Sequence, residues 1–159
     1  MKGPTWVGLV RTASEKGITI AIAESCTGGY ISSKLTDVPG ASKCFIGAFV
    51  VYSNDLKMGG LRISPATLKE HGAVSRETSR EMAERCREIS KADISLSVTG
   101  IAGPSGGSPD KPIGTVFITV VSDRGAVLTE GFDLGPLKRV QFKKAVSERA
   151  LGMLMGALR

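Results

Sequence analysis

Residues 18–29, with the sequence ITIAIAESCTGG, decide the fold of this chain. The apolar, β-branched run from Ile18 to Ala23 predicts a short buried strand. It follows Lys16-Gly17, a basic residue and a glycine that are typical of a helix C-terminus, so a first helix is expected before it. The Gly28-Gly29 pair predicts a turn, and residues 30–35 are predicted to form the next helix.

The remaining sequence continues this alternation of strands and helices. Apolar runs rich in β-branched residues predict four further strands, over residues 44–52, 93–98, 113–121 and 126–132. The first of these is expected to be a central strand. Cap residues predict two helices, one beginning at Ser64-Pro65 and one at Ser75, and apolar periodicity predicts a last helix over residues 138–158.

These elements together predict the architecture. Strands that alternate with helices, followed by a hairpin with its turn at residues 122–125, indicate a three-layer α/β/α fold with a mixed, mostly parallel five-stranded sheet. A length of 159 residues fits one domain, so residues 1–159 are expected to form a single unit. In the last helix, Leu151 and Met155 widen the apolar stripe, which indicates either a subunit contact in a homo-oligomer or deeper burial.

Charge and composition exclude several classes of function. The net charge is +6, but the basic residues are scattered and mixed with Glu, without aromatic residues between them, so nucleic-acid binding is not expected. A basic surface that attracts an anionic small substrate fits this pattern better. Three cysteines without CxxC spacing and one histidine cannot form a disulfide framework or a His/Cys zinc site, so no metal is expected.

The cysteines and the hydrophobic pattern also indicate where in the cell the protein is expected. Free thiols are typical of a reducing compartment. The first residues lack the apolar segment of a signal peptide, and no stretch approaches the ~20 apolar residues of a membrane span. The protein is therefore expected to be cytoplasmic and not to bind a membrane.

Three segments of unusual composition follow predicted strands: ESCTGG at residues 24–29, YSNDLK at residues 52–57 and TGIAGPSGG at residues 99–107. In an open α/β sheet, ligands bind at the carboxyl ends of the strands. We therefore expect these three segments to converge on one site.

In the first segment, Ser25 stands at a strand-to-helix turn. Its hydroxyl could lie beside the free amides of a helix N-terminus, which can bind an anion or the oxyanion of an acyl-transfer reaction. The segment is not a GxSxG nucleophile elbow, because Ala23 and Glu24 precede the serine. The alternative is that Ser25 or Thr27 only caps the helix.

The third segment is a candidate anion-binding loop. Its glycines would allow close approach of the backbone to a phosphate. It is not a dinucleotide fingerprint, because Ala102 and Ser105 stand where that pattern needs glycine, and no Gly-Lys-Ser/Thr of a P-loop follows. A flexible surface loop is the alternative.

A nucleophilic serine needs a base. The only histidine, His71, precedes Gly72 at the end of a predicted helix and is expected to be structural, which argues against a Ser-His-Asp triad. A lysine with a lowered pKa can serve instead, and Lys57 is the lysine whose neighbours place it near the site, although a solvated surface position is the alternative. Cys26, beside Ser25, is expected to be a packing residue.

Several longer motifs resemble a known family: AESCTGG at residues 23–29, VPG at 38–40, YSN at 52–54, Lys57, HGAVS at 71–75, VTGIAGP at 98–104 and KPIGTV at 111–116. They are similar to the C-terminal domain of the competence/damage-inducible protein CinA and to the stand-alone nicotinamide-nucleotide amidases of that family. The similarity covers about residues 5–158.

This resemblance implies a reaction. The carboxamide of nicotinamide mononucleotide would be hydrolysed to nicotinate mononucleotide and ammonia, without a metal or another cofactor. Ser25 would be the nucleophile and Lys57 the general base. Tyr52, Asn54 and Thr99 lie in matching motifs and are expected to orient the lysine or bind substrate.

The resemblance also assigns binding roles to backbone groups. The amides of Thr27, Gly28 and Gly29 are expected to form the oxyanion hole. The loop that contains Gly100, Gly103 and Gly106 is expected to receive the phosphate of the substrate.

Two departures from the family pattern leave an alternative function open. Relatives commonly have Gly-Asp/Asn-Arg before the last helix, whereas residues 135–139 are GPLKR, so that only Lys138 or Arg139 could replace that arginine. The N-terminal nucleotide-processing domain of full-length CinA is not found in this sequence, so pyrophosphatase activity is not expected. The alternative is a non-catalytic nucleotide-binding module, or a partner subunit of a separate pyrophosphatase-like protein. In either case a homo-oligomer, dimer or trimer, is expected.

Overall fold

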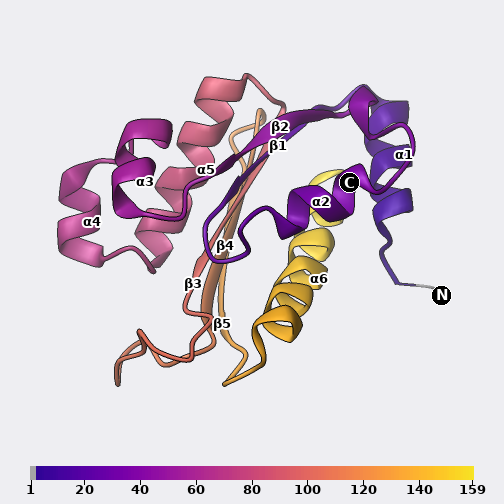
Figure 1. Ribbon diagram of the computed structural model, residues 1–159. Coiled ribbons are helices and arrows are strands. Elements are labelled where there is room, and N and C mark those ends of the chain that lie inside the picture. The colour runs from indigo at the N-terminus through magenta and orange to yellow at the C-terminus, as the bar shows by residue number, and fades with distance from the viewer. Residues whose placement is uncertain (1–2) are drawn as a thin grey trace.

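The computed structural model describes residues 3–159 (Figure 1). Its elements in chain order are α1 (Trp6–Lys16), β1 (Ile20–Glu24), α2 (Tyr30–Thr36), the 3-10 helix η1 (Ala41–Lys43), β2 (Phe45–Val50), α3 (Asn54–Leu61), α4 (Pro65–His71), α5 (Arg76–Ser90), β3 (Ile94–Gly100), β4 (Thr115–Ser122), β5 (Val127–Asp133) and α6 (Arg139–Ala157). The predicted caps are confirmed at Gly17, Ser64 and Ser75: Gly17 ends α1 in the left-handed region, and the two serine hydroxyls accept amide hydrogen bonds at the starts of α4 and α5.

The five strands form one sheet in the order β2-β1-β3-β4-β5. β1 pairs in parallel with β2 and with β3, whereas β4 is antiparallel to both β3 and β5. Four strands therefore run in one direction and β4 runs against them. Helices α1, α2 and α6 lie on one side of the sheet and α3, α4 and α5 on the other (Figure 1). The predicted three-layer α/β/α fold with a mixed, mostly parallel five-stranded sheet is confirmed.

Strand β1 is fully buried, and its composition explains how the two layers fit on it. Ile20 and Ile22 belong to the larger core cluster beneath α1, α2 and α6. Ala21 and Ala23 point to the opposite face, where they pack with Met82 and other residues of the α5 side. Because successive side chains of a strand alternate between faces, the Ile/Ala alternation gives one face bulk and lets α5 approach the other closely.

In the region after β1, one prediction is wrong and one helix was missed. The strand predicted as central, β2, is an edge strand that pairs only with β1, because β3 occupies the other side of β1. An apolar run predicts a strand but not its place in the sheet, and Ile46 and Val50 are in fact 54% and 46% exposed. Helix α3 was not predicted, because its eight residues include Gly59 and Gly60 and show weak apolar periodicity.

The last helix uses its wide apolar stripe within the chain. Leu151 is buried in the larger core cluster, and Met155 packs against that cluster. Deeper burial, rather than a subunit contact, therefore accounts for these two residues. Among residues 3–159, none of the helices has the length and the apolar character needed to span a membrane.

Candidate active site

The three glycine-rich or polar segments meet in a cavity of about 280 Å³ at the carboxyl ends of β1 and β3. The chain leaves β1 towards α2 and the edge strand β2, whereas it leaves β3 towards the hairpin on the opposite side, so the cavity lies where the connections diverge. Its lining comprises Ser25, Cys26, Tyr52, Asn54, Lys57, Ala73, Val74, Gly100, Ile101, Ala102, Gly103, Ser105, Gly106 and Arg139. The predicted convergence of the three segments is thus what the structure shows.

Ser25 and Lys57 are in direct contact in this cavity. The Nζ of Lys57 lies 3.0 Å from the Oγ of Ser25 and also donates to the carbonyls of Val51, at 3.1 Å, and Tyr52, at 3.4 Å. Lys57 is 1% exposed, and Ser25 is 7% exposed. Burial lowers the pKa of the Lys57 ammonium below its ordinary value of 10.5, and the main opposing influence is the thiol of Cys26. The surface position considered for Lys57 is therefore excluded.

The local sequence explains how Lys57 reaches the serine. Ser53 caps α3 through a hydrogen bond from the amide of Leu56, which starts the helix directly after β2. Lys57 is then in the first turn of α3, and a helical side chain points back towards the N-terminus of its helix. Since β2 pairs in parallel with β1, that N-terminus lies at the same edge of the sheet as Ser25.

The two rival groups considered for the chemistry are not suited to it. Burial raises the pKa of the Cys26 thiol to about 12, so this side chain stays protonated and is a poor nucleophile at neutral pH. His71 ends α4 and lies 3.9 Å from the carboxylate of Glu77, away from the residues that line the cavity. Ser25 and Lys57 are left as the pair with a direct contact.

Glu24, which the sequence did not single out, occupies the N-terminus of α2. Its buried carboxylate accepts hydrogen bonds from the amides of Gly29, Ile31 and Ser32 at 2.8–3.1 Å, and from the hydroxyls of Thr27 and Ser32. A carboxylate at a helix N-terminus is favoured by the helix dipole. Glu24 therefore takes the place that a substrate anion could otherwise have had on α2.

The amides assigned to the oxyanion hole require a correction. The amide of Gly29 donates to Glu24, and the amide of Gly28 donates to the carbonyl of Ser25 at 3.0 Å. Both glycine amides therefore already have acceptors. Within the described chain, the amides of Cys26 and Thr27 donate to no other residue. Thr27 is fully buried and only Cys26 lines the cavity, so the amide of Cys26 is the candidate oxyanion donor in the turn.

Arg139 closes the other side of the cavity. Its guanidinium donates to the hydroxyl of Tyr52 at 3.3 Å and to the carbonyl of Gly103. Of the two basic residues that could replace the family arginine, the structure therefore brings Arg139 to the cavity. Asn54, Gly100, Gly103 and Gly106 also line it, as the sequence predicts for residues near the substrate.

Thr99 has a different position from the one expected. Its buried hydroxyl donates to the carbonyl of Ala73 at 2.7 Å and does not reach Lys57. The contact holds the turn that carries Ala73 and Val74, which form one wall of the cavity. The next residue has to be glycine, because a Cβ on Gly100 would lie 2.8 Å from the carbonyl oxygen of Thr115.

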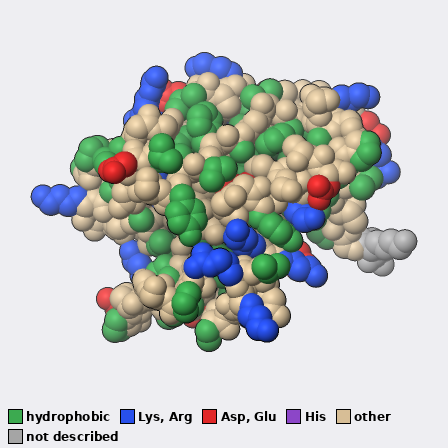
Figure 2. All heavy atoms as spheres, viewed as in Figure 1, with side chains coloured by type: hydrophobic (Ala, Val, Ile, Leu, Met, Phe, Trp, Pro, Cys, Tyr) green, Lys and Arg blue, Asp and Glu red, His purple; other side chains and the backbone are tan. Residues whose placement is uncertain are grey.

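The cavity is basic. Lys57 and Arg139 line it, and no Asp or Glu is among its lining residues. On the face drawn in Figure 2, several Lys and Arg side chains gather just below the centre, in the region of the lower strand ends and of α6. No three His, Cys, Asp or Glu side chains of residues 3–159 lie close enough together to hold a metal ion. The arrangement suits an anionic organic substrate.

The comparison with protein families shows which family the chain belongs to. The model described as "CinA C-terminal domain" matches residues 7–158. This chain belongs to that family. The recognised CinA resemblance is thereby confirmed.

Named relatives agree with this assignment. A CinA-like protein from Chlorobaculum tepidum is 52% identical over 124 residues, covering 77% of this chain and 29% of the relative. A putative competence-damage inducible protein from Caldanaerobacter subterraneus is 54% identical over 110 residues, covering 69% of this chain and 27% of the relative. The chain thus spans less than a third of the length of either relative.

Solved structures of CinA proteins match over nearly the whole chain. The competence/damage inducible protein CihA from Agrobacterium tumefaciens superposes with a TM-score of 0.90 and 37% identity, covering 99% of both chains. A CinA superfamily protein from Escherichia coli gives a TM-score of 0.87 and 28% identity, covering 95% of this chain and 89% of its own.

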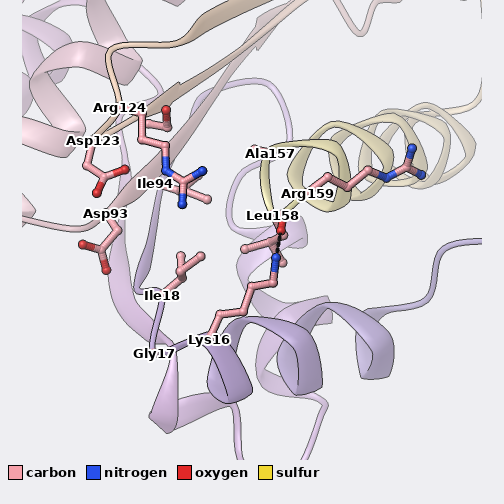
Figure 3. A pocket seen from close by; sticks show the side chains of 11 residues that line it. Lys16, Gly17, Ile18, Asp93, Ile94, Asp123, Arg124, Ala157, Leu158 and Arg159 are labelled. Atoms are coloured by element: carbon pink, nitrogen blue, oxygen red, sulfur yellow. Dashed lines mark hydrogen bonds between the residues drawn. The ribbon is translucent and has the colours of Figure 1, made fainter.

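This CinA domain has a second cavity, of about 250 Å³, at the opposite end of the sheet (Figure 3). Lys16, Asp93, Arg124 and Arg159 are among its lining residues. Two of its charged groups are used within the chain: Lys16 donates to the carbonyl of Leu158, and Asp93 accepts from the amide and hydroxyl of Thr19 at 2.8 and 2.7 Å. This cavity lacks a nucleophile–base pair and is not a candidate active site.

Proposed function

We propose that this CinA-family chain is an amide hydrolase that converts nicotinamide mononucleotide to nicotinate mononucleotide and ammonia. The observation that carries the proposal is the 3.0 Å contact between the Nζ of Lys57 and the Oγ of Ser25, with both side chains buried. A lysine whose pKa is lowered by burial can act as the general base for a serine, in place of the histidine of a triad.

The hydrogen bonds of Lys57 support a neutral amine as the reactive form. As an ammonium, Nζ has three N–H groups, and the structure offers three acceptors: Ser25 and the carbonyls of Val51 and Tyr52. When one proton is lost, the two remaining N–H groups can stay on the two carbonyls. The lone pair then faces the hydroxyl of Ser25, ready to accept its proton.

The reaction follows in two halves. In the first, Lys57 takes the proton of Ser25 while Oγ attacks the carboxamide carbon, and the amide of Cys26 stabilises the oxyanion. Lys57 then returns the proton to the leaving nitrogen, which departs as ammonia and leaves an ester on Ser25. In the second half, Lys57 takes a proton from water as the water oxygen attacks the ester carbon. Lys57 then gives this proton to Oγ as the ester bond breaks, which restores the serine hydroxyl and releases the acid product, and the acid ionises to the carboxylate.

The substrate class is supported by the charge of the site and by the family resemblance. A cavity with two cations and no acidic lining residue favours a substrate that carries a phosphate. Arg139 has a planar set of donors that matches phosphate oxygens. Because Arg139 lies at the cavity despite the altered sequence at residues 135–139, that alteration gives less support to the alternative of a non-catalytic binding module.

The experiment is an ammonia-release assay with nicotinamide mononucleotide on the purified wild type, Ser25→Ala and Lys57→Ala proteins. The proposal requires turnover by the wild type and its loss in both variants. A folded wild type that binds the nucleotide without turnover, or that copurifies with a pyrophosphatase-like partner, would instead favour the binding module or partner subunit. We further propose that residues 1–159 act as one domain, that no metal or cofactor takes part, and that the chain works in the cytoplasm as a dimer or trimer.

A further inference from the structure

Lys143 is a cation beside the candidate active site, and within residues 3–159 no acidic side chain pairs with it. It lies on α6, one helical turn after Arg139, and is half-buried. Its Nζ is 3.7 Å from the place that a Cβ would take on Gly28, so the ammonium sits over the turn that follows Ser25. Across residues 3–159 it takes part in no ion pair and no hydrogen bond.

The charge of Lys143 reaches the cavity. Its positive charge lowers the pKa of the Cys26 thiol against the larger effect of burial, and Cys26 is one of the residues that line the cavity. Residues four apart on a helix share a face, so Arg139 and Lys143 present their cations to the same side of α6. Two N–H groups of Arg139 donate to Tyr52 and Gly103, whereas all three N–H groups of the Lys143 ammonium are available to a ligand.

The ammonium of Lys143 has no acidic partner among the residues around the cavity. Glu24, the buried acid of the neighbouring turn, accepts five hydrogen bonds from α2 and the residues before it, none of them from Lys143. The cavity itself offers no acidic residue. A half-buried cation without a partner costs desolvation, which a bound anion would offset.

We propose that Lys143 is a specificity-determining residue that binds the phosphate monoester of the substrate and so distinguishes a nucleotide from its nucleoside. This inference rests on the proposed amidase function and adds the group that selects the phosphate. Lys143 is a point charge with rotatable donors, which suits a dianionic phosphate. It differs from the glycine loop of Gly100 to Gly106, to which the sequence assigned the phosphate, because that loop offers backbone donors but no net charge.

The test compares Lys143→Ala with wild type on nicotinamide mononucleotide and on its phosphate-free riboside. Losing a charge-assisted hydrogen bond of this kind corresponds to a change of roughly tenfold to a hundredfold in affinity. We expect Lys143→Ala to raise KM for the nucleotide by about that factor with kcat within about twofold, and to leave the riboside kinetics unchanged. Lys143→Arg should restore most of the nucleotide KM. Lys144→Ala, which removes an exposed lysine from the neighbouring position, is the matched control and should behave as wild type.

The outcomes separate this inference from the amidase proposal. Equal effects on both substrates, or a fall in kcat alone, would overturn it and place Lys143 at the reacting carboxamide instead. If the wild type shows no turnover, the amidase proposal fails. Calorimetric titration of wild type and Lys143→Ala with the nucleotide and the riboside then still tests whether Lys143 binds the phosphate. Nucleotide affinity that is the same in both proteins overturns the role of Lys143.

Discussion

The Nζ of Lys57 lies 3.0 Å from the Oγ of Ser25, although the two residues are 32 positions apart in the sequence. The contact is produced by topology. Ser25 follows β1, Lys57 lies in the first turn of the helix that follows β2, and the parallel pairing of these two strands brings their carboxyl ends together. A lysine in an equivalent place after an antiparallel neighbour would lie at the other end of the sheet.

This contact predicts that both side chains are essential for activity and not for folding. Replacing Ser25 by Ala removes the nucleophile, and replacing Lys57 by Ala removes the base, so we expect kcat/KM to fall about 10³-fold or more in each. The double variant should be no worse than either single variant, because the two groups act as a unit. Ammonia release measures the rate, and circular dichroism verifies the fold.

A matched control is available in the same cavity. Ser105 also lines it and makes no hydrogen bond to Ser25 or Lys57, so Ser105→Ala removes the same chemical group without changing the Ser25–Lys57 contact. It should retain activity within about threefold, as expected for a residue that does not take part in the reaction. Loss of activity in Ser105→Ala comparable to that in Ser25→Ala would contradict the assignment of the nucleophile.

The lowered pKa of Lys57 predicts how activity depends on pH. Only the neutral amine can accept the serine proton, so kcat/KM should rise with pH through the folded-state pKa of Lys57 and then level off. Because burial lowers this pKa, the plateau should begin below 10.5, the ordinary lysine value. The pH–rate profile measures this midpoint, and Lys57→Arg, which stays charged, should be inactive at every pH.

The lowered pKa of Lys57 also predicts how the free energy of unfolding changes with pH. Between the lowered folded-state pKa of Lys57 and the ordinary value of 10.5, the unfolded chain binds more protons than the folded one. The free energy of unfolding therefore gains a contribution that rises with pH across this window. Lys57→Met removes it, so urea titrations at several pH values should show a flatter dependence in the variant. A slope that is equal in both proteins would argue that Lys57 is not desolvated.

Sequence predicted the fold and the dyad for identifiable reasons, and the failures have physical causes too. Capping residues such as Ser64 and Ser75 act locally, so they fix helix starts from sequence alone. The edge position of β2 depends on which strand pairs with the far side of β1, a non-local choice that an apolar run does not encode. Lys57 is found by family resemblance, because its burial depends on the unpredicted helix α3.

The predictions about substrate-binding groups also divide into those that depend on local sequence and those that depend on non-local contacts. The amides of Gly28 and Gly29 were expected to face substrate, but Glu24 and Ser25 satisfy them, and only coordinates reveal which acceptor an amide finds. Arg139 and Lys143 could have been linked from sequence by their spacing of four on a helix. That Arg139 lines the cavity and Lys143 lies near Gly28 depends on how α6 packs on the sheet, which the sequence does not show.

The hydrogen bonds of Glu24 predict that this residue stabilises the fold and takes no part in catalysis. Its carboxylate satisfies three amides of α2 and two hydroxyls while fully buried. In Glu24→Gln the amide NH₂ would face amide donors, and we expect the free energy of unfolding to fall by about 2–4 kcal/mol. Chemical denaturation measures this. Glu148→Gln, which changes an exposed glutamate on α6, should have an effect below about 0.5 kcal/mol. Equal effects in both variants would show that the α2 contacts contribute nothing.

The position of Arg139 predicts that its replacement weakens substrate binding and has little effect on the chemical step. Its guanidinium is placed at the cavity by the hydroxyl of Tyr52 and the carbonyl of Gly103. Arg139→Met should raise KM for nicotinamide mononucleotide by roughly tenfold or more, because a charge-assisted contact with the substrate is lost. Tyr52→Phe removes only one exposed partner of the guanidinium and should raise KM by less than about threefold. A normal KM in Arg139→Met would mean that the arginine only holds the loop at Gly103.

The unpaired edge of β2 gives a prediction about self-association. Ile46 and Val50 are 54% and 46% exposed on an edge strand, and an open apolar edge of this kind is a ready surface for pairing with another chain. If a dimer or trimer forms through this edge, Ile46→Lys combined with Val50→Lys should convert it to a monomer in sedimentation experiments, since buried charge at an interface is strongly unfavourable. Val7→Lys changes an apolar residue that is 63% exposed on α1 and should leave the oligomer intact. An oligomer that survives the double substitution uses another surface, and a wild type that sediments as a monomer rules out the homo-oligomer itself.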